Sequence, residues 1–179
     1  LDRIDITIEV PALTAADRCR SGLVRTHQIP KPFSGMTTFE NVFVAASHGK
    51  TSGRDEAYGR VVDSLRLCGM LGVANRRADT LGLLDRKRLE LARALATGPR
   101  LLLLDEIGGG LTDGEASELV ETILELRRRG IGIVWIEHIV HILLQVVERL
   151  ICMDAGKIIA DGNPKTVMSD AEVVRAYLG

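Results

Sequence analysis

Two adjacent carboxylates, Asp105 and Glu106, directly follow the apolar run of residues 101–104. A short continuous apolar run is typical of a buried strand in a parallel sheet, and such sheets bind ligands beyond the carboxyl ends of their strands. One carboxylate there can hold Mg²⁺ through its water shell while its neighbour polarises an attacking water. The alternative is a core strand that ends in a solvated acidic turn, and the pair alone does not decide between them.

A histidine lies at the corresponding end of a second apolar run. Residues 133–136 precede Glu137 and His138, so we expect the imidazole at the same edge of the sheet as Glu106. An imidazole beside the terminal phosphate of a nucleotide can donate a hydrogen bond to it and help to orient the attacking water. The alternative is a histidine at a helix N-terminus that has no ligand.

Gln28 is a third candidate, because its neutral amide precedes a turn-rich break at residues 29–35 and could accept from a metal-bound water. By itself this glutamine would carry no functional information. Among the other histidines we expect His141 at the surface or in packing, and the sequence names no partner for His27 or His48.

The elements that must position these side chains begin with a mixed N-terminal part and a helical middle. We interpret residues 4–10 and 22–24 as strands, with a helix start at residues 14–20 between them. Residues 36–96 have a helical pattern that the glycine-rich residues 47–53 interrupt. The predicted helices of this middle part are residues 37–45, 54–68 and 85–97, the last of them ended by Gly98 and Pro99.

Beyond residue 99 strand and helix patterns alternate. Thr112 and Glu115 form a capping box, which predicts a helix that ends in three arginines and Gly130. The other expected elements are a buried strand at 131–136, a helix at 139–149, a hairpin at 151–160 and a helix at 171–178. This alternation predicts a parallel sheet with right-handed crossovers, and so an α/β core with a helical insertion.

The composition restricts the class of protein. Hydrophobic residues make up 46% and the net charge is −1, which is ordinary for a globular domain and gives no argument for nucleic acid. The three scattered cysteines argue against disulfides or a zinc site and fit a reducing cytoplasm. No apolar run reaches the ~20 residues that span a bilayer. Because the chain begins with Leu1 and enters an alternating stretch directly, we expect that an N-terminal portion is missing.

Taken together and in order, Gln28, residues 81–85, residues 104–106 and His138 resemble the nucleotide-binding domain of ABC transporters. The chain is most similar to the ATP-binding subunits of branched-chain amino-acid importers, through residues 22–28, 36–42, 88–95 and 174–179. The resemblance covers essentially the whole chain and implies an N-terminally truncated α/β fold of the P-loop NTPase (RecA-like) class. Its implied parts are the end of the N-terminal core region (1–28), a helical subdomain (29–98) and the remaining core (99–179).

The resemblance also implies a role for each candidate. Glu106 would be the catalytic glutamate and His138 the switch histidine, while Asp105, as the Walker B aspartate, and Gln28 would contact Mg²⁺ and its nucleotide. The segments implied to contact ATP, partly across a dimer, are the signature loop (Leu81, Gly82, Leu83, Leu84, Asp85) and the D-loop (Gly110, Thr112, Asp113).

The family implies ATP and Mg²⁺ as cofactors, and membrane permeases and a second nucleotide-binding subunit as partners. It further implies a peripheral location on the cytoplasmic face of the inner membrane. Two departures bear on this picture. The family signature Leu-Ser-Gly-Gly-Gln is here Leu-Gly-Leu-Leu-Asp, although Asp85 could simply cap the following helix. Ile107 replaces the proline usually found after the catalytic glutamate.

A third departure is that the sequence contains no phosphate-binding loop of the form Gly-x-x-x-x-Gly-Lys-Ser/Thr. Gly49, Lys50 and Thr51 come nearest, but Val44 stands where the first glycine is needed, and we expect a surface loop there. Since that loop supplies much of the binding and transition-state energy for phosphates, we expect this polypeptide alone to bind ATP weakly and not to hydrolyse it.

Two alternatives to a transport ATPase subunit stay open. A degenerate or shortened paralogue could act as a non-enzymatic regulatory or structural partner, and the altered residues 81–85 favour it. An unrelated α/β ligand-binding module would require the order of the motifs to be a coincidence.

Overall fold

The computed structural model describes residues 13–49 and 53–177. The strand expected at residues 4–10 therefore lies outside the described residues, as do Lys50 and Thr51. Along the described chain the elements are α1 (Ala15–Arg20), β1 (Leu23–Arg25), α2 (Thr38–His48), α3 (Arg54–Leu67), the 3₁₀ helices η1 (Leu71–Val73) and η2 (Ala78–Thr80), α4 (Leu83–Ala96), β2 (Leu101–Asp105), α5 (Asp113–Arg128), β3 (Gly132–Ile136), α6 (Val140–Leu143), β4 (Leu150–Asp154), β5 (Lys157–Gly162), α7 (Pro164–Met168) and α8 (Ala171–Tyr177).

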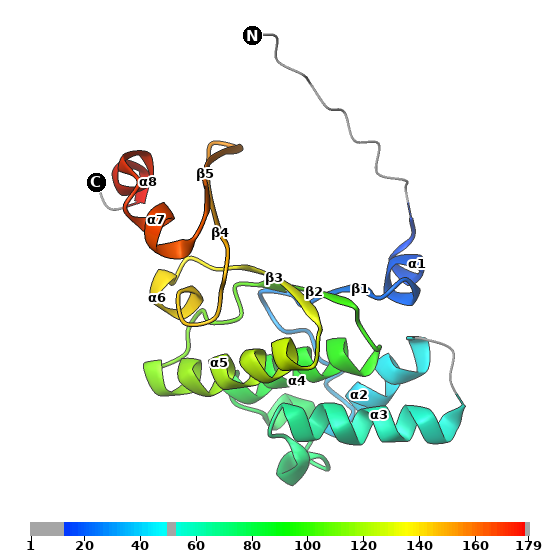
Figure 1. Cartoon of the computed structure of the whole chain (residues 1–179). Coiled ribbons are helices and arrows are strands. Elements are labelled where there is room, and N and C mark those ends of the chain that lie inside the picture. Colours follow the sequence, from blue (N-terminus) through cyan, green and yellow to red (C-terminus); the bar gives the residue numbers. More distant parts are fainter. Residues whose placement is uncertain (1–12, 50–52, 178–179) are drawn as a thin grey trace.

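A parallel sheet with the strand order β1-β2-β3 lies between the helical part and the C-terminal hairpin (Figure 1). Leu102 of β2 lies opposite Val24 on one side and Ile133 on the other. Because all three strands run the same way, residues that follow β1, β2 and β3 emerge at one edge of the sheet. The structure thus confirms the predicted parallel α/β arrangement.

Helices cover one face of this sheet. Figure 1 shows α4 and α5 on the same side of β2 and β3, and buried residues from both helices share one core with Leu102 and Leu104. On β3, by contrast, Val134 is 50% exposed and Ile136 is 63% exposed. The prediction of a fully buried strand at 131–136 is therefore wrong, because the described helices contact only one face of β3. The apolar run alone does not distinguish one covered face from two.

The helical middle part packs on the far side of α4 from the sheet. Thr37 caps α2 and forms a capping box with Glu40. The rings of Phe39 and Phe43 of α2 are stacked, and the Tyr58 ring of α3 packs against both at a tilt. The main core runs without a break from Val42 in this part to residues of α5 and β2. The boundary expected near residue 98 stays a prediction, as does the three-part division of the chain.

Two predicted helices have different bounds in the structure. Helix α4 begins at Leu83 with Gly82 as its N-cap, so the expectation that Asp85 caps it is wrong, and Asp85 lies in its first turn. The helix expected at 139–149 is reduced to α6, because the backbone beyond it makes turns: the Val146 N–H bonds to the Leu143 carbonyl at 2.9 Å. The Val146 carbonyl accepts instead from the Arg127 guanidinium at 2.9 Å, so it does not continue the helix.

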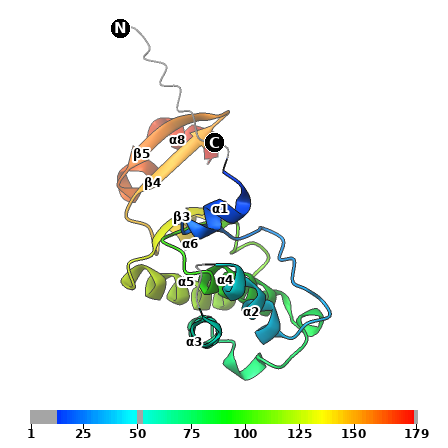
Figure 2. The ribbon, with the colours of Figure 1, turned by 90° about the vertical axis from the view of Figure 1, so that its right-hand side faces the viewer.

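A separate small core joins the C-terminal hairpin to α7 and α8. Figure 2 shows the ribbon of this hairpin beside α8. The predicted hairpin is present as β4 and β5 in antiparallel pairing, and the Tyr177 hydroxyl donates to the Met153 carbonyl at 2.6 Å. Helix α7 was not expected, although Asn163 as N-cap and Pro164 in the first turn are its sequence signal.

Cysteine reactivity should follow burial in this fold. Cys68 is 1% exposed and burial raises the pKa of its thiol to about 12, and burial also raises the pKa of Cys152. Since the thiolate is the reactive form, we expect iodoacetamide at about pH 8 to alkylate Cys68 at least about a hundredfold more slowly than Cys19. Peptide mass spectrometry measures the rates, and urea should abolish the difference. Equal rates in the folded chain would contradict the packing of α3.

Candidate functional site

Glu106, the residue that follows β2, adopts a left-handed backbone conformation with φ 45°. A non-glycine residue in that region costs about 1–3 kcal/mol and persists only where its surroundings impose it. Here the Glu106 N–H donates to the Ile136 carbonyl at 2.9 Å, and the Glu106 carbonyl accepts from Gly109 N–H at 3.4 Å and from the Lys87 ammonium at 3.2 Å. The backbone that presents the Glu106 side chain is therefore fixed from three sides.

Gln28 and His138 converge on the Glu106 carboxylate, although the strand pattern places only His138 at this edge. The Gln28 amide nitrogen donates a hydrogen bond to Oε2 of Glu106. His138 Nδ1 lies 3.6 Å from the same oxygen, and its side chain is 65% exposed. The carboxylate itself is about one third exposed, so water reaches it from the open side of this edge. A carboxylate held between an amide and an imidazole has the arrangement that a base for an attacking water needs.

Asp105 ends β2 immediately before this cluster. Its N–H donates to the hydroxyl of Thr26, a fully buried residue beyond β1, at 3.3 Å. The Asp105 carboxylate and the amide oxygen of Gln28, the two predicted metal ligands, are an all-oxygen donor set, which suits a hard cation such as Mg²⁺. Among the described residues there is no group of three His, Cys, Asp or Glu side chains that could hold a metal by themselves. Protein oxygens alone would therefore not fill the coordination shell of Mg²⁺ here. Water and phosphate oxygens would complete the shell, as is usual for this ion.

The segment that carries Gln28 is tied to α4 by a buried carboxylate. His27 Nδ1 lies 2.9 Å from Oε1 of Glu90, and the Arg93 guanidinium lies 3.0 Å from the other Glu90 oxygen. Arg93 also donates to the Lys31 carbonyl at 3.0 Å and lies over the ring of Phe33. These contacts supply the partner of His27 that the sequence does not name, and they hold the chain on both sides of Gln28.

Residues 81–85 lie against the predicted D-loop rather than against Glu106. A Cβ atom on Gly110, whose φ is 77°, would lie 3.2 Å from Leu83 Cδ2, so the two segments touch. Within the described residues, no hydrogen bond or ion pair joins residues 81–85 to Gln28, Glu106 or His138. The Asp85 carboxylate lies 3.8 Å from Arg88, which also pairs with Glu118 of α5.

The N-terminus of α4 and the start of α5, beside the predicted D-loop, are both exposed. Gly82 makes no side-chain cap, and a Cβ atom there would meet only open space. Thr112 caps α5 as predicted, and Asp113 opens that helix with a fully exposed side chain 3.9 Å from His141. An uncapped helix N-terminus can accept an anion, although the nearby Asp85 charge opposes this. The roles of residues 81–85, Gly110, Thr112 and Asp113 stay predictions.

Two residues at this edge received no role from the sequence. Lys87 of α4 is 5% exposed, and burial lowers the pKa of its ammonium against the opposing effect of the Glu137 and Glu106 carboxylates. The Glu137 side chain is fully buried beside the exposed His138. Lysines on helices are usually solvated, so nothing local in the sequence marks Lys87 as buried. Its burial follows only from the packing of α4 against the turn after β2.

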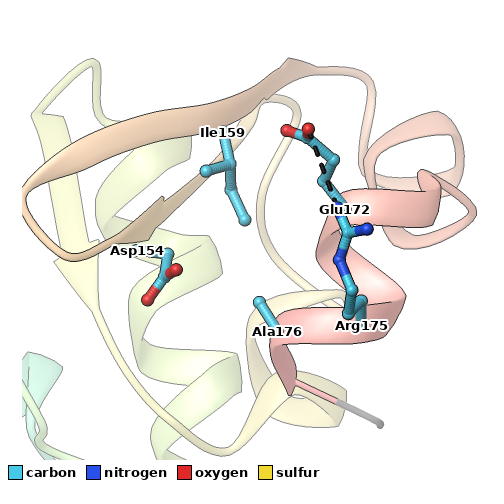
Figure 3. A pocket seen from close by; sticks show the side chains of 5 residues that line it. All are labelled: Asp154, Ile159, Glu172, Arg175 and Ala176. Carbon is cyan, nitrogen blue, oxygen red and sulfur yellow. Dashed lines mark ion pairs between the residues drawn. The ribbon is translucent and has the colours of Figure 1, made fainter.

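A pocket elsewhere shares no residue with this edge. It lies between the C-terminal hairpin and α8 and is lined by Asp154, Ile159, Glu172, Arg175 and Ala176 (Figure 3). Glu172 and Arg175 form an ion pair at 3.8 Å within α8. None of the predicted site residues lines this pocket.

Comparisons with known proteins identify the family of this chain. The family described as ABC transporter matches residues 3–108, and the family described as branched-chain amino acid ATP-binding cassette transporter matches residues 157–179. The high-affinity branched-chain amino acid transport ATP-binding protein LivG of Escherichia coli is 35% identical over 89% of this chain and 69% of its own length. The lipopolysaccharide export system ATP-binding protein LptB of Haemophilus influenzae is 31% identical over 96% of this chain and 71% of its own.

A solved structure gives the same result for the fold. The ADP conformation of MJ1267, an ATP-binding cassette of an ABC transporter, superposes with a TM-score of 0.80 at 30% identity, over 92% of this chain and 71% of the other. The P-loop NTPase fold expected from the sequence is thereby confirmed.

Proposed function

The chain belongs to the ABC transporter family, and we propose that it provides the water-activating edge of an ATP-hydrolysing subunit that energises a membrane importer. The transported solutes are branched-chain amino acids or related small molecules. The convergence of Gln28 and His138 on the carboxylate of Glu106 is the observation that carries this proposal. The solute class rests on likeness to LivG and on the C-terminal family match, which is support by analogy.

In this proposal each side chain at the edge has one task. The Glu106 carboxylate accepts a proton from the attacking water, and the Gln28 amide and the imidazole of His138 keep that carboxylate in place. Asp105 and Gln28 would hold Mg²⁺ through oxygen, and the ion would supply positive charge against the phosphates of ATP. His138 is exposed enough to donate to a terminal phosphate.

A second nucleotide-binding subunit would meet this chain at residues 81–85 and at the D-loop. Gly82, Leu83 and Gly110 are exposed there, with Leu83 at 48%. Their exposure beside an uncapped helix start supports a surface that contributes to a neighbour's nucleotide. Trapping of nucleotide by a Glu106→Gln variant distinguishes a second copy of this chain from a different subunit. In a homodimer this variant should trap nucleotide in two sites.

A permease would dock on the helical part of the chain, beyond Gln28. Met36, which follows this segment, lies beside Ala78, whose N–H donates to the Met36 carbonyl at 3.0 Å. Ile29, Phe33 and Met36 are 69%, 44% and 38% exposed on this surface. Among the described residues no helix has the length and apolar character to cross a bilayer. We place the chain on the cytoplasmic face of the inner membrane through this contact.

A nucleotide titration tests the proposal. We expect the isolated polypeptide, which has no Gly-x-x-x-x-Gly-Lys-Ser/Thr loop, to bind Mg-ATP with a Kd weaker than about 1 mM. We define the P-loop fusion as this chain with the phosphate-binding segment of an ABC ATP-binding subunit joined ahead of Leu1. It should bind at least about tenfold more tightly and hydrolyse ATP. Micromolar binding by the isolated polypeptide would contradict the proposal.

A second candidate function is that of a degenerate paralogue which regulates or supports an active subunit. The replacement of two signature glycines by Leu83 and Leu84, with Asp85 next to them, favours it. The same titration separates the two, because a P-loop fusion that binds ATP without hydrolysing it would support the degenerate paralogue.

A further inference from the structure

The Glu137 side chain is fully buried, whereas its neighbour His138 points outward with 65% of its side chain exposed. Oε2 of Glu137 accepts from the Gly108 N–H at 3.0 Å, and Oε1 accepts from the His138 N–H at 3.2 Å. Oε1 also lies 3.4 Å from His138 Nδ1. One buried carboxylate thus contacts the backbone after β2 and the backbone after β3.

The contact with Gly108 depends on the absence of a side chain there. A Cβ atom at this position would lie 3.1 Å from Glu137 Oε2 and 3.2 Å from Ile142 Cδ1. The carboxylate therefore approaches the turn as closely as the packing permits. Since a buried N–H without a partner is costly, loss of the carboxylate would leave the buried Gly108 amide without its partner. It would also free the more exposed His138 amide.

Lys87 approaches the same turn from α4. Its ammonium donates to the Glu106 carbonyl at 3.2 Å, and only 5% of the residue is exposed. A Cβ atom on Gly109 would lie 3.9 Å from His138 Cε1 and 4.0 Å from the Lys87 nitrogen, so the lysine, the turn and the imidazole are mutual neighbours. Helix α4 begins directly after Gly82, so this contact joins the start of α4 to the turn that presents Glu106.

We propose that Glu137 is a positioning residue for ATP hydrolysis: through the Gly108 and His138 amides it fixes the turn that carries Glu106 relative to the imidazole of His138. Lys87 extends the same arrangement to α4. This inference rests on the proposed function. Glu137 has no contact with water or nucleotide in this role. Loss of the Glu137 carboxylate therefore affects the turnover rate and leaves nucleotide binding nearly unchanged.

Two variants and a control test the role of Glu137. Glu137→Ala removes both acceptors, Glu137→Gln keeps one acceptor oxygen in a similar shape, and Glu121→Ala removes an exposed acid from α5. In the isolated polypeptide, amide hydrogen exchange of Gly108 and His138 should accelerate at least about tenfold in Glu137→Ala, less in Glu137→Gln and not in Glu121→Ala. Amide exchange within α5 reports whether each variant is folded. If Glu137→Ala is unfolded, the exchange of Gly108 and His138 in Glu137→Gln tests the role of Glu137 instead.

ATP hydrolysis by the P-loop fusion supplies the functional arm. We expect kcat to fall at least about tenfold in Glu137→Ala, with KM for ATP changed less than about threefold and a partial recovery in Glu137→Gln. Unchanged amide exchange, or a kcat within about twofold of the wild type in a folded Glu137→Ala fusion, would overturn the assignment. If the wild-type fusion does not hydrolyse ATP, the proposed function fails, and the exchange of the two amides still tests whether Glu137 holds the turn after β2.

Discussion

Glu106→Gln is expected to lower kcat for ATP hydrolysis by about 10²–10⁴-fold in the P-loop fusion, with ATP affinity changed less than about threefold. The amide has nearly the shape of the carboxylate and can stay beside Gln28 and His138, but it cannot accept the proton of the attacking water. The Glu106 backbone should keep its conformation, because its N–H and carbonyl are held by Ile136, Gly109 and Lys87.

The control for this substitution is Glu148→Gln, which makes the same chemical change on a side chain that is 82% exposed and is not one of the residues at the edge. Phosphate release gives kcat, and equilibrium titration with Mg-ATP gives the affinity. A Glu106→Gln fusion that hydrolyses ATP at half the wild-type rate or faster would show that another group activates the water.

Ile123→Ala is expected to destabilise the fold by about 2–5 kcal/mol, the usual cost of a cavity in a packed core. Ile123 of α5 is fully buried against the covered face of the sheet. Ile136→Ala is the matched control, because Ile136 is 63% exposed at the end of β3. We expect that control to change the free energy of unfolding by no more than about 0.5 kcal/mol.

Urea titration monitored by circular dichroism measures both values, with m compared to confirm that the denatured states are alike. The difference between the two isoleucines tests the finding that the described helices cover one face of the sheet. Equal losses at Ile123 and Ile136 would contradict it.

The elements with strong local signals could be predicted from the sequence. The apolar run before Asp105 gives β2, and the capping box of Thr112 and Glu115 gives the start of α5. The approach of His138 to Glu106 follows from topology, because residues after neighbouring parallel strands emerge at one edge. These predictions need only local pattern and strand direction.

The contacts that hold this edge depend on packing between distant segments. Nothing local marks Glu106 for a left-handed conformation, and nothing marks Glu137 as buried while His138 is exposed. Lys87 reaches the turn only because α4 packs beneath it. The early end of α6 could not be predicted for a similar reason. The Arg127 guanidinium, which donates to the Val146 carbonyl, belongs to another helix.

The central claim is that nucleotide-bound metal lies at the edge formed by Gln28, Asp105, Glu106 and His138. Replacing Mg²⁺ with paramagnetic Mn²⁺ in the ATP-bound P-loop fusion tests it directly, by nuclear magnetic resonance of the isotope-labelled protein. We expect ATP-dependent broadening to remove the signals of Gln28, Glu106 and His138 and to spare those of the pocket beside α8. Broadening centred on that pocket, with the Glu106 and His138 signals unchanged, would show that the metal binds elsewhere.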